Sequence, residues 1–522
     1  MSARDPRLDD PGADDPAAED DGIPGNRDAH GHRLRHARGL SLVARSAPLV
    51  VAGELAPMVA ALVAMPAIVR GFGAERLGLL QLAWVLIGYF ALFDLGLGRA
   101  TTRMVAVRSA HGRSAEIPPL VVSTVAALFA LGVASAAILT ALTPWLVDHA
   151  FRVPSELRDE ARVALYVLGA TVPVVVVTAA LRGVLEARQR FGALAGIRIG
   201  LGLASFLGPL STLPFTSSLV PVMVVLAVAR VIALFAHLAF CRDVLHGAAL
   251  DWRLLPELVR YGGWLTVSNV VSPLLVLLDR FMIGAIVSVE AVAYYATPLE
   301  VVQRVGVVPT AVGMVLFPAI AATAASDDER RRELLAAGLR LGPIAAFPLL
   351  FLLSAWTPEL LRLWLGPEFA SHGTAVVRCV AIGLLFNAVA AGPIFFLQAS
   401  GRPDLPAKFH LVEFAGYVPL LAWLTARYGV VGAASAWSMR VAVDAALLVL
   451  AANAAEPVPR DARKRLFISF AAGLSALCAI PLLLSDAMKI IASIVAVLGM
   501  PLAAMRWLST PRERAWVRQA IG

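Results

Sequence analysis

Ionisable residues interrupt two long apolar stretches in the middle of the chain, and they are the residues best placed to do chemistry. Asp279 and Arg280 lie in the first stretch, and Glu300 and Arg304 lie in the second, beyond a turn at residues 288–290. A charged side chain at membrane depth costs roughly 2.5–3.5 kcal/mol even on a lenient insertion scale, so it usually serves a function. A helix rises 1.5 Å per residue, which puts Arg280 and Glu300 at matching depth, on the order of 10–15 Å from the turn. The two stretches therefore predict a layer of opposite charges inside a membrane.

Six more ionisable residues fall inside apolar stretches elsewhere. Glu300 and Arg304 are four positions apart, as are Arg440 and Asp444, so each pair shares a helix face and can form an ion pair. Such pairs either hold buried helices together or line a wet interior, and the spacing leaves both interpretations open. Besides Arg440 and Asp444, the six additional residues include Glu54, Arg198, Arg230 and Glu413.

Charges on so many spans are best accommodated if they face one common interior, away from lipid. Arginine is frequent among them, and its guanidinium group binds phosphate with two parallel hydrogen bonds. We therefore predict a substrate-binding cavity lined by Arg280, Arg304, Asp279, Glu300, Arg230, Arg198, Arg440, Asp444 and Glu54.

The patterns expected of an enzyme are missing from the sequence. It contains neither the phosphate loop G-x-x-x-x-G-K-[ST] nor the zinc motif H-E-x-x-H. Its cysteines, Cys241, Cys379 and Cys478, are scattered and fit neither a disulfide framework nor a zinc site. We predict no catalytic residue, no cofactor and no metal.

The composition is that of an integral membrane protein. Of the 522 residues, 59% are hydrophobic and only 16% are charged, and the mean hydropathy is +0.75. Soluble globular chains have about 25% charged residues. The net charge of +8 is explained by basic loops at a membrane, so we expect no nucleic-acid partner.

Apolar runs of roughly 20 residues, the length that crosses a bilayer, recur along the chain. They predict fourteen transmembrane helices, at about 47–68, 78–98, 117–143, 162–181, 192–213, 219–240, 262–286, 292–319, 338–356, 375–398, 406–426, 430–452, 466–485 and 489–507.

The loops between these runs alternate in their arginine content. The arginine-rich loops lie at 99–113, 182–190, 242–260, 330–340, 402–408 and 460–465, and the intervening loops carry few basic residues. Because basic loops stay in the cytoplasm, this alternation predicts that both termini are cytoplasmic.

The segments 64–84 and 279–299 share one scheme, a span followed by a short acidic turn and a helix of small residues. They point to two parallel repeats, an arrangement found in transporters. We expect a disordered, first acidic and then basic, cytoplasmic tail at 1–40, an N-terminal helix bundle at 41–245 and a cytoplasmic linker at 246–260. A C-terminal bundle at 261–453 and two additional spans with a cytoplasmic tail at 454–522 complete the chain.

Three patches of the sequence resemble the bacterial polysaccharide-biosynthesis flippases. This family belongs to the superfamily of multidrug, oligosaccharidyl-lipid and polysaccharide exporters. The patches are GFGAERLGLLQLAWVLIGYFALFDLGLGRA at 71–100, LLDRFMIGAIVSVEAVAYYA at 277–296 with LFPAI at 316–320, and LWLGPEFA at 363–370. The layout of fourteen spans with short loops is similar as well, and the resemblance covers essentially the chain after residue 40.

The resemblance implies an all-α polytopic membrane protein in which two six-helix bundles surround a cationic cavity, with two further C-terminal helices. It implies a flippase of the bacterial inner membrane that exports a polyprenyl-diphosphate-linked oligosaccharide for lipopolysaccharide or exopolysaccharide biosynthesis by alternating access. Arg280, with its neighbour Asp279, is the position that matches the family motif, and the arginine would meet the diphosphate. The implied partners are the lipid-linked oligosaccharide, membrane lipids, a polysaccharide polymerase, glycosyltransferases and H⁺ or Na⁺ as a coupling ion.

Two alternatives stay open. A cation-coupled multidrug exporter of the same superfamily would be expected to have acids and aromatic residues in its cavity, with less arginine. A scaffold of a polysaccharide assembly complex that transports nothing would have no use for buried charges.

Overall fold

The computed structural model describes residues 25–92, 94, 96–246, 249–256, 258, 275, 277–323, 327–480, 485–500 and 502–503. Every element in these residues is helical. A helix satisfies all its backbone hydrogen bonds within one segment, which suits a chain surrounded by lipid. Among the described residues, nine helices are long and apolar enough to cross a membrane.

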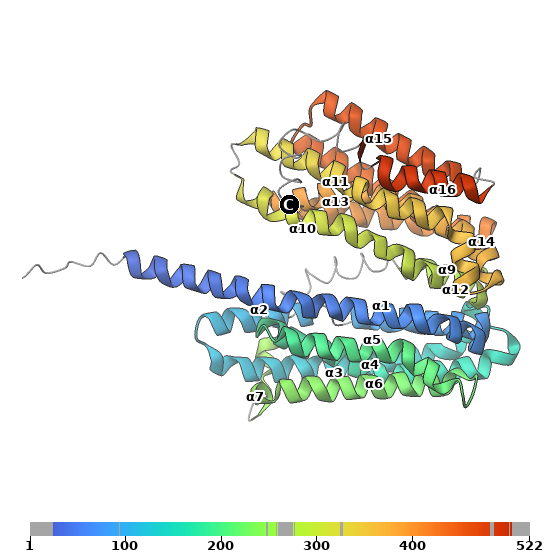
Figure 1. Ribbon diagram of the computed structural model, residues 1–522. Coiled ribbons are helices and arrows are strands. Elements are labelled where there is room, and N and C mark those ends of the chain that lie inside the picture. Colours follow the sequence, from blue (N-terminus) through green and yellow to red (C-terminus); the bar gives the residue numbers. More distant parts are fainter. Residues whose placement is uncertain are drawn as a thin grey trace, which may run out of the picture.

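The helices form two bundles, coloured blue to green and yellow to red in Figure 1. The first consists of α1 (Gly25–Leu92), α2 (Leu97–Ala110), α3 (Ile117–Trp145), α4 (Arg158–Ala187), α5 (Phe191–Thr212), α6 (Leu219–Phe240) and the short α7 (Arg242–Leu245). α1 is two helices that meet at Gly73, where φ is 75°. Glycine occupies this left-handed conformation without steric cost, so the chain reverses there.

The second bundle begins with a helix over residues 277–286, which ends before Ser288. It continues with α9 (Val289–Val302), α10 (Val307–Ala322), α11 (Asp328–Ala355), α12 (Thr357–Trp364), α13 (Pro367–Ala399), α14 (Asp404–Ala455), α15 (Arg460–Ala479) and α16 (Asp486–Ile494). α14 also consists of two helices, which meet at Gly429 with φ 58°.

The turns lie at two opposite ends of the molecule. We call the end with the turns at Gly73, Ser288 and Gly429 the Gly73 end, and the end with the turns at His111 and Gly401 the His111 end. Figure 1 shows α9 and α12 against α1 at the Gly73 end, and the two bundles diverge from there toward the His111 end.

Close contacts join the bundles at the Gly73 end. A Cβ atom on Gly78 of α1 would lie only 1.7 Å from the carbonyl oxygen of Val289 in α9. The indole Nε1 of Trp364 donates a hydrogen bond of 2.8 Å to the carbonyl oxygen of Leu62. Leu80 and Val292 are fully buried in one apolar core that includes both bundles. The bundles are therefore packed against each other at this end.

One expectation about the elements needs correction. α1 begins at Gly25, so residues 25–40 are helical where the sequence predicts a disordered tail. Alanine, leucine and arginine are frequent in this segment, and all three favour helix. The span expected at 292–319 is confirmed by a described span at Val289–Ala322. It contains a 3₁₀ turn at Gln303–Gly306, because Pro309 lacks the N–H group that would bond to the carbonyl of Val305.

The predicted number of fourteen spans stays a prediction. The spans expected at 262–286 and 489–507 lie partly outside the described residues, as do residues 247–248, 257 and 259–260 of the cytoplasmic linker expected at 246–260. Within that linker the structure describes a 3₁₀ turn at Trp252–Leu254.

Candidate functional site

Asp279 lies in the C-terminal bundle and is completely buried. The hydroxyl of Tyr295, on α9, donates a hydrogen bond of 2.5 Å to its Oδ2 atom. The backbone N–H of Arg280 donates one of 2.8 Å to Oδ1. A buried carboxylate is tolerated only when donors and a positive charge surround it, and Asp279 has both.

Arg280 is also buried, with 5% of its surface exposed. Its charge acts on Asp279 and on Glu300, yet its Nε atom has no hydrogen-bond partner among the described residues. An unpaired buried donor on a guanidinium group is costly. This group is therefore suited to receive an anion.

Glu300 connects the two bundles. It accepts a hydrogen bond from Gln81 of α1, and its charge interacts with those of Arg280 and Arg304. Gln81 is itself buried and also donates a hydrogen bond of 3.3 Å to the hydroxyl of Thr297. Glu300 therefore lies where α1 meets α9.

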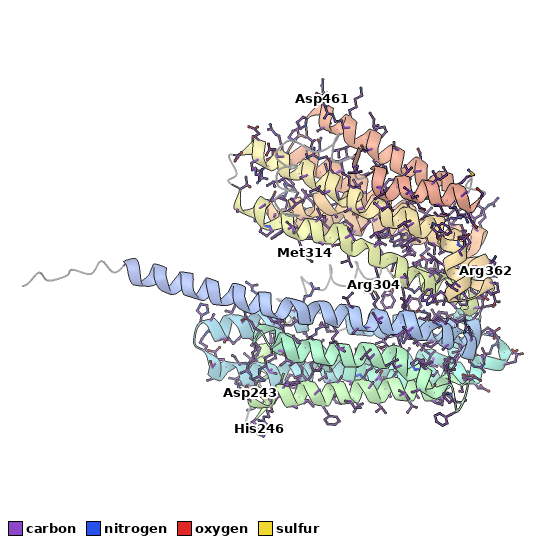
Figure 2. All side chains as sticks on the ribbon, in the orientation of Figure 1. Asp243, His246, Arg304, Met314, Arg362 and Asp461 are labelled. Carbon is purple, nitrogen blue, oxygen red and sulfur yellow. The ribbon has the colours of Figure 1, made fainter. Side chains whose placement is uncertain are left out.

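Arg304 lies on the 3₁₀ turn after α9 and is exposed. Figure 2 shows it on the face of the C-terminal bundle that is turned toward α1. Asp279, Arg280, Glu300 and Arg304, which we call the central charge cluster, thus run from the bundle interior to this face.

A second group of charges lies on the two halves of α14, and we call it the α14 cluster. Arg440 Nη1 lies 3.3 Å from Glu413 Oε2, and His410 Nε2 lies 3.8 Å from Asp444 Oδ1. The sequence predicts an ion pair between Arg440 and Asp444. The chain reversal at Gly429 instead brings Glu413 to Arg440, and the described ion pair joins these two residues.

The α14 cluster has unused hydrogen-bonding capacity. One ligand atom from each of His410, Glu413 and Asp444 lies within 4.8 Å of the others. Glu413 Oε1 and Asp444 Oδ1 are buried without hydrogen-bond partners among the described residues. Tyr417 belongs to this cluster by position, because the Cζ atom of Arg440 lies 5.7 Å from the centroid of its ring. The charges of Asp279 and Arg280 also act on Tyr417.

The remaining predicted site residues belong to the N-terminal bundle. Arg230 lines a separate cavity of about 210 Å³ together with Thr178 and Ser205, and it donates a hydrogen bond of 2.8 Å to the carbonyl of Leu226. Arg198 is exposed on α5. The side chain of Glu54 lies outside the described part of the structure. Within the described residues, the structure brings together the predicted residues of the C-terminal bundle.

The sequence predictions did not include several polar residues of the site. Tyr295, Gln81, Tyr417 and His410 belong to the clusters, and Glu413 is named only as a charge within a span. Each is a polar residue inside an apolar helix, which is the signal that would have identified it. Chemically, the arrangement offers a buried guanidinium group for an anion and a group of carboxylates for a cation.

Residues 43–324 match the model of a family described as polysaccharide biosynthesis protein. The chain is also 27% identical over 400 residues to a Shigella flexneri protein named "Putative O-antigen transporter", which covers 76% of this chain and 94% of that protein.

Two solved structures share the fold. The lipid II flippase MurJ, in an inward closed conformation, has a TM-score of 0.63 at 13% identity, covering 83% of this chain and 97% of that one. An inward-facing multidrug resistance transporter of the MATE family, in the MOP superfamily, has a TM-score of 0.62 at 14% identity, covering 82% and 96%. Because the family model matches more than half of the chain, this protein belongs to the polysaccharide biosynthesis protein family, as the sequence predicts.

Proposed function

We propose that this protein is a flippase that moves a polyprenyl-diphosphate-linked oligosaccharide between the leaflets of the bacterial inner membrane for surface polysaccharide biosynthesis. Membership of the family and the name of the Shigella flexneri relative support a transporter with this type of cargo. The observation that carries the proposal is the buried guanidinium group of Arg280, whose Nε atom has no partner among the described residues.

The central charge cluster suggests how the cargo binds and leaves. A diphosphate that enters a low-dielectric cavity needs fixed cations to replace its water. Arg280 and Arg304 would supply them, while Asp279 and Glu300 neutralise the arginines when the site is empty. The cargo then competes with internal carboxylates, which gives a binding and a release state without a nucleotide. Arg230, Arg198, Arg440, Asp444 and Glu54 would line the path of the head group.

We propose that the His111 end faces the cytoplasm. The arginine-rich loops lie at this end, and basic loops remain in the cytoplasm. Both termini would then be cytoplasmic, and the two bundles, at 41–245 and 261–453, would be packed together on the periplasmic side. We further propose that residues 1–40 form a cytoplasmic tail and that residues 246–260 form a cytoplasmic linker between the bundles. Residues 454–522 would add two spans and a second cytoplasmic tail.

A coupling ion would supply the energy of transport. We propose H⁺ or Na⁺, because the α14 cluster holds two buried carboxylates and an imidazole close together. A polysaccharide polymerase and glycosyltransferases would be the partners that consume and supply the cargo.

Substitution of Arg280 tests the proposal. Arg280→Ala should abolish export of the surface glycan and leave lipid-linked oligosaccharide in the cytoplasmic leaflet, because it removes the buried cation. Arg280→Lys should retain part of the activity, since it keeps the charge but loses the two-pronged hydrogen bonding. The matched control is Arg362→Ala, which removes an exposed arginine on α12 and should leave export unchanged.

Other outcomes support other functions. A multidrug exporter predicts that a deletion strain has normal surface glycan and greater sensitivity to cationic dyes. A scaffold predicts that deletion abolishes the glycan while Arg280→Ala does not.

A further inference from the structure

Gln81 belongs to the N-terminal bundle, but its amide group is bound by residues of the C-terminal one. It lies on α1 with 1% of its surface exposed. Its Nε2 atom donates a hydrogen bond of 3.3 Å to the hydroxyl of Thr297 on α9, and it also donates to the carboxylate of Glu300. An amide nitrogen carries two hydrogens, so one side chain can serve both acceptors. Gln81 therefore holds Glu300 from the opposite bundle.

Glu300 is hydrogen-bonded to this amide, although two guanidinium groups lie near it. Arg280 and Arg304 act on Glu300 through their charges. The Nε atom of Arg280 has no hydrogen-bond partner among the described residues. A hydrogen bond between a carboxylate and a guanidinium group is stronger than one to a neutral amide. Gln81 thus keeps Glu300 from using this donor of Arg280 and leaves it to another anion.

The contact depends on the packing of the Gly73 end. Gly78 lies one helical turn before Gln81, on the same side of α1, since residues three apart are neighbours on a helix. At Gly78 the helix lies so close to the backbone of Val289 in α9 that a Cβ atom would collide with it. Gln81 reaches Thr297 and Glu300 because α1 and α9 touch there. If the bundles separate at this end, Gln81 moves away with α1.

We infer that Gln81 couples closure of the Gly73 end to the affinity of the central charge cluster for diphosphate. While this end is closed, Gln81 holds Glu300 and Arg280 binds the phosphate. When the end opens, Gln81 withdraws, and Glu300 pairs with Arg280 and displaces the diphosphate. The cargo is then released on the side that has just opened. This inference rests on the proposed function and makes Gln81 a positioning residue that acts through Glu300.

Binding of inorganic pyrophosphate to the full chain purified in detergent, measured by titration calorimetry, tests the inference. Arg280→Ala should abolish binding, as the proposed function requires. Gln81→Met keeps the length of the side chain but removes the amide, and it should weaken binding about tenfold, the effect of one hydrogen bond to a charged group. Adding Glu300→Gln should restore the affinity, because a neutral side chain does not compete for Arg280. The matched control is Thr297→Val, which removes the other partner of Gln81 and should leave the affinity unchanged.

A second pair of variants tests the link to the Gly73 end. Gly78→Leu forces α1 away from the backbone of α9, so it should weaken pyrophosphate binding while Gln81 itself is intact. Glu300→Gln should cancel this loss as well. The control is Gly196→Leu, because a Cβ atom at Gly196 meets no atom within 4 Å.

The outcomes separate this inference from the proposed function. If Arg280→Ala abolishes binding while Gln81→Met binds as tightly as the unchanged protein, the inference is wrong and the proposed function stands. A loss in Gln81→Met that persists with Glu300→Gln would show that Gln81 only supports packing, and it would also overturn the inference. If the unchanged protein binds no pyrophosphate, both fail. Melting temperatures identify a variant that has not folded, and the Gly78→Leu pair then decides.

Discussion

The hydroxyl group of Tyr295 stabilises the buried charge of Asp279 by a hydrogen bond. Asp279 has no exposed surface, and the Tyr295 hydroxyl is one of two described donors to its carboxylate. Both residues lie in the C-terminal bundle, so this hydrogen bond acts within one packed unit. The backbone N–H of Arg280 donates to the same carboxylate. The orientation of Arg280 toward an anion therefore depends on the hydrogen bond from Tyr295.

We predict that Tyr295→Phe lowers the free energy of unfolding by about 1–3 kcal/mol, because it leaves a buried carboxylate oxygen without its donor. Thermal unfolding in detergent measures the loss. Tyr428→Phe is the control, since Tyr428 is 57% exposed. Equal melting temperatures for both variants would contradict the assigned role.

The exposure of Arg304 gives a second prediction at this scale. In a background without Cys241, Cys379 and Cys478, Arg304→Cys should react rapidly with a small water-soluble thiol reagent. Arg280→Cys should react more slowly, because residue 280 is buried. Ala388→Cys, at a fully buried position, should not react. If Arg304→Cys also fails to react, the charges hold helices together and do not line a wet interior.

At the scale of elements, the contact between α1 and α9 depends on the absence of a side chain. Gly78 lies so close to the carbonyl of Val289 that any Cβ atom would collide with backbone. Backbone atoms cannot move aside as a flexible side chain can. The Gly73 end therefore packs only with glycine at this position.

We predict that Gly78→Leu separates α1 from α9 and opens the Gly73 end. Thr297, which is fully buried beside Gln81, would then become accessible. Thr297→Cys should react with a thiol reagent in the Gly78→Leu background. Gly196→Leu is the control, because a Cβ atom at Gly196 meets no atom within 4 Å. Equal reactivity in both backgrounds would show that the contact does not control opening.

The sequence predicted the membrane class, the family and the charges of the C-terminal bundle, because hydropathy and charge within spans are local signals. The partners of those charges were less predictable. Arg440 and Glu413 are 27 positions apart, and only the reversal at Gly429 brings them together. The hydrogen bond from Tyr295 to Asp279 likewise joins two helices across the turn at Ser288. Spacing within one helix cannot indicate such pairs.

The whole molecule is asymmetric from end to end. The bundles pack together at the Gly73 end and diverge toward the His111 end (Figure 1). Figure 2 shows Arg304 and Met314 on the C-terminal bundle where it faces the N-terminal one. The side of the membrane on which the His111 end lies is therefore a central question for the proposed flippase.

Reporter fusions determine this side. We predict cytoplasmic signals at residue 20, at Arg331 and after Arg518, and a periplasmic signal near Glu368, because arginine-rich loops alternate with loops that carry few basic residues. A periplasmic signal at Arg331 would reverse the proposed orientation.

The balance of charge in the central charge cluster also has an electrical consequence. Asp279, Arg280, Glu300 and Arg304 are formally neutral together, so the empty cluster carries no net charge through the field of the membrane. A bound diphosphate adds about two negative charges, and an inside-negative potential of 100 mV favours their outward movement by roughly 4–5 kcal/mol. The charge of the cargo therefore makes the loaded step electrogenic, whereas the empty central charge cluster adds no charge to the return step. Collapse of the membrane potential with an ionophore should slow the loaded step.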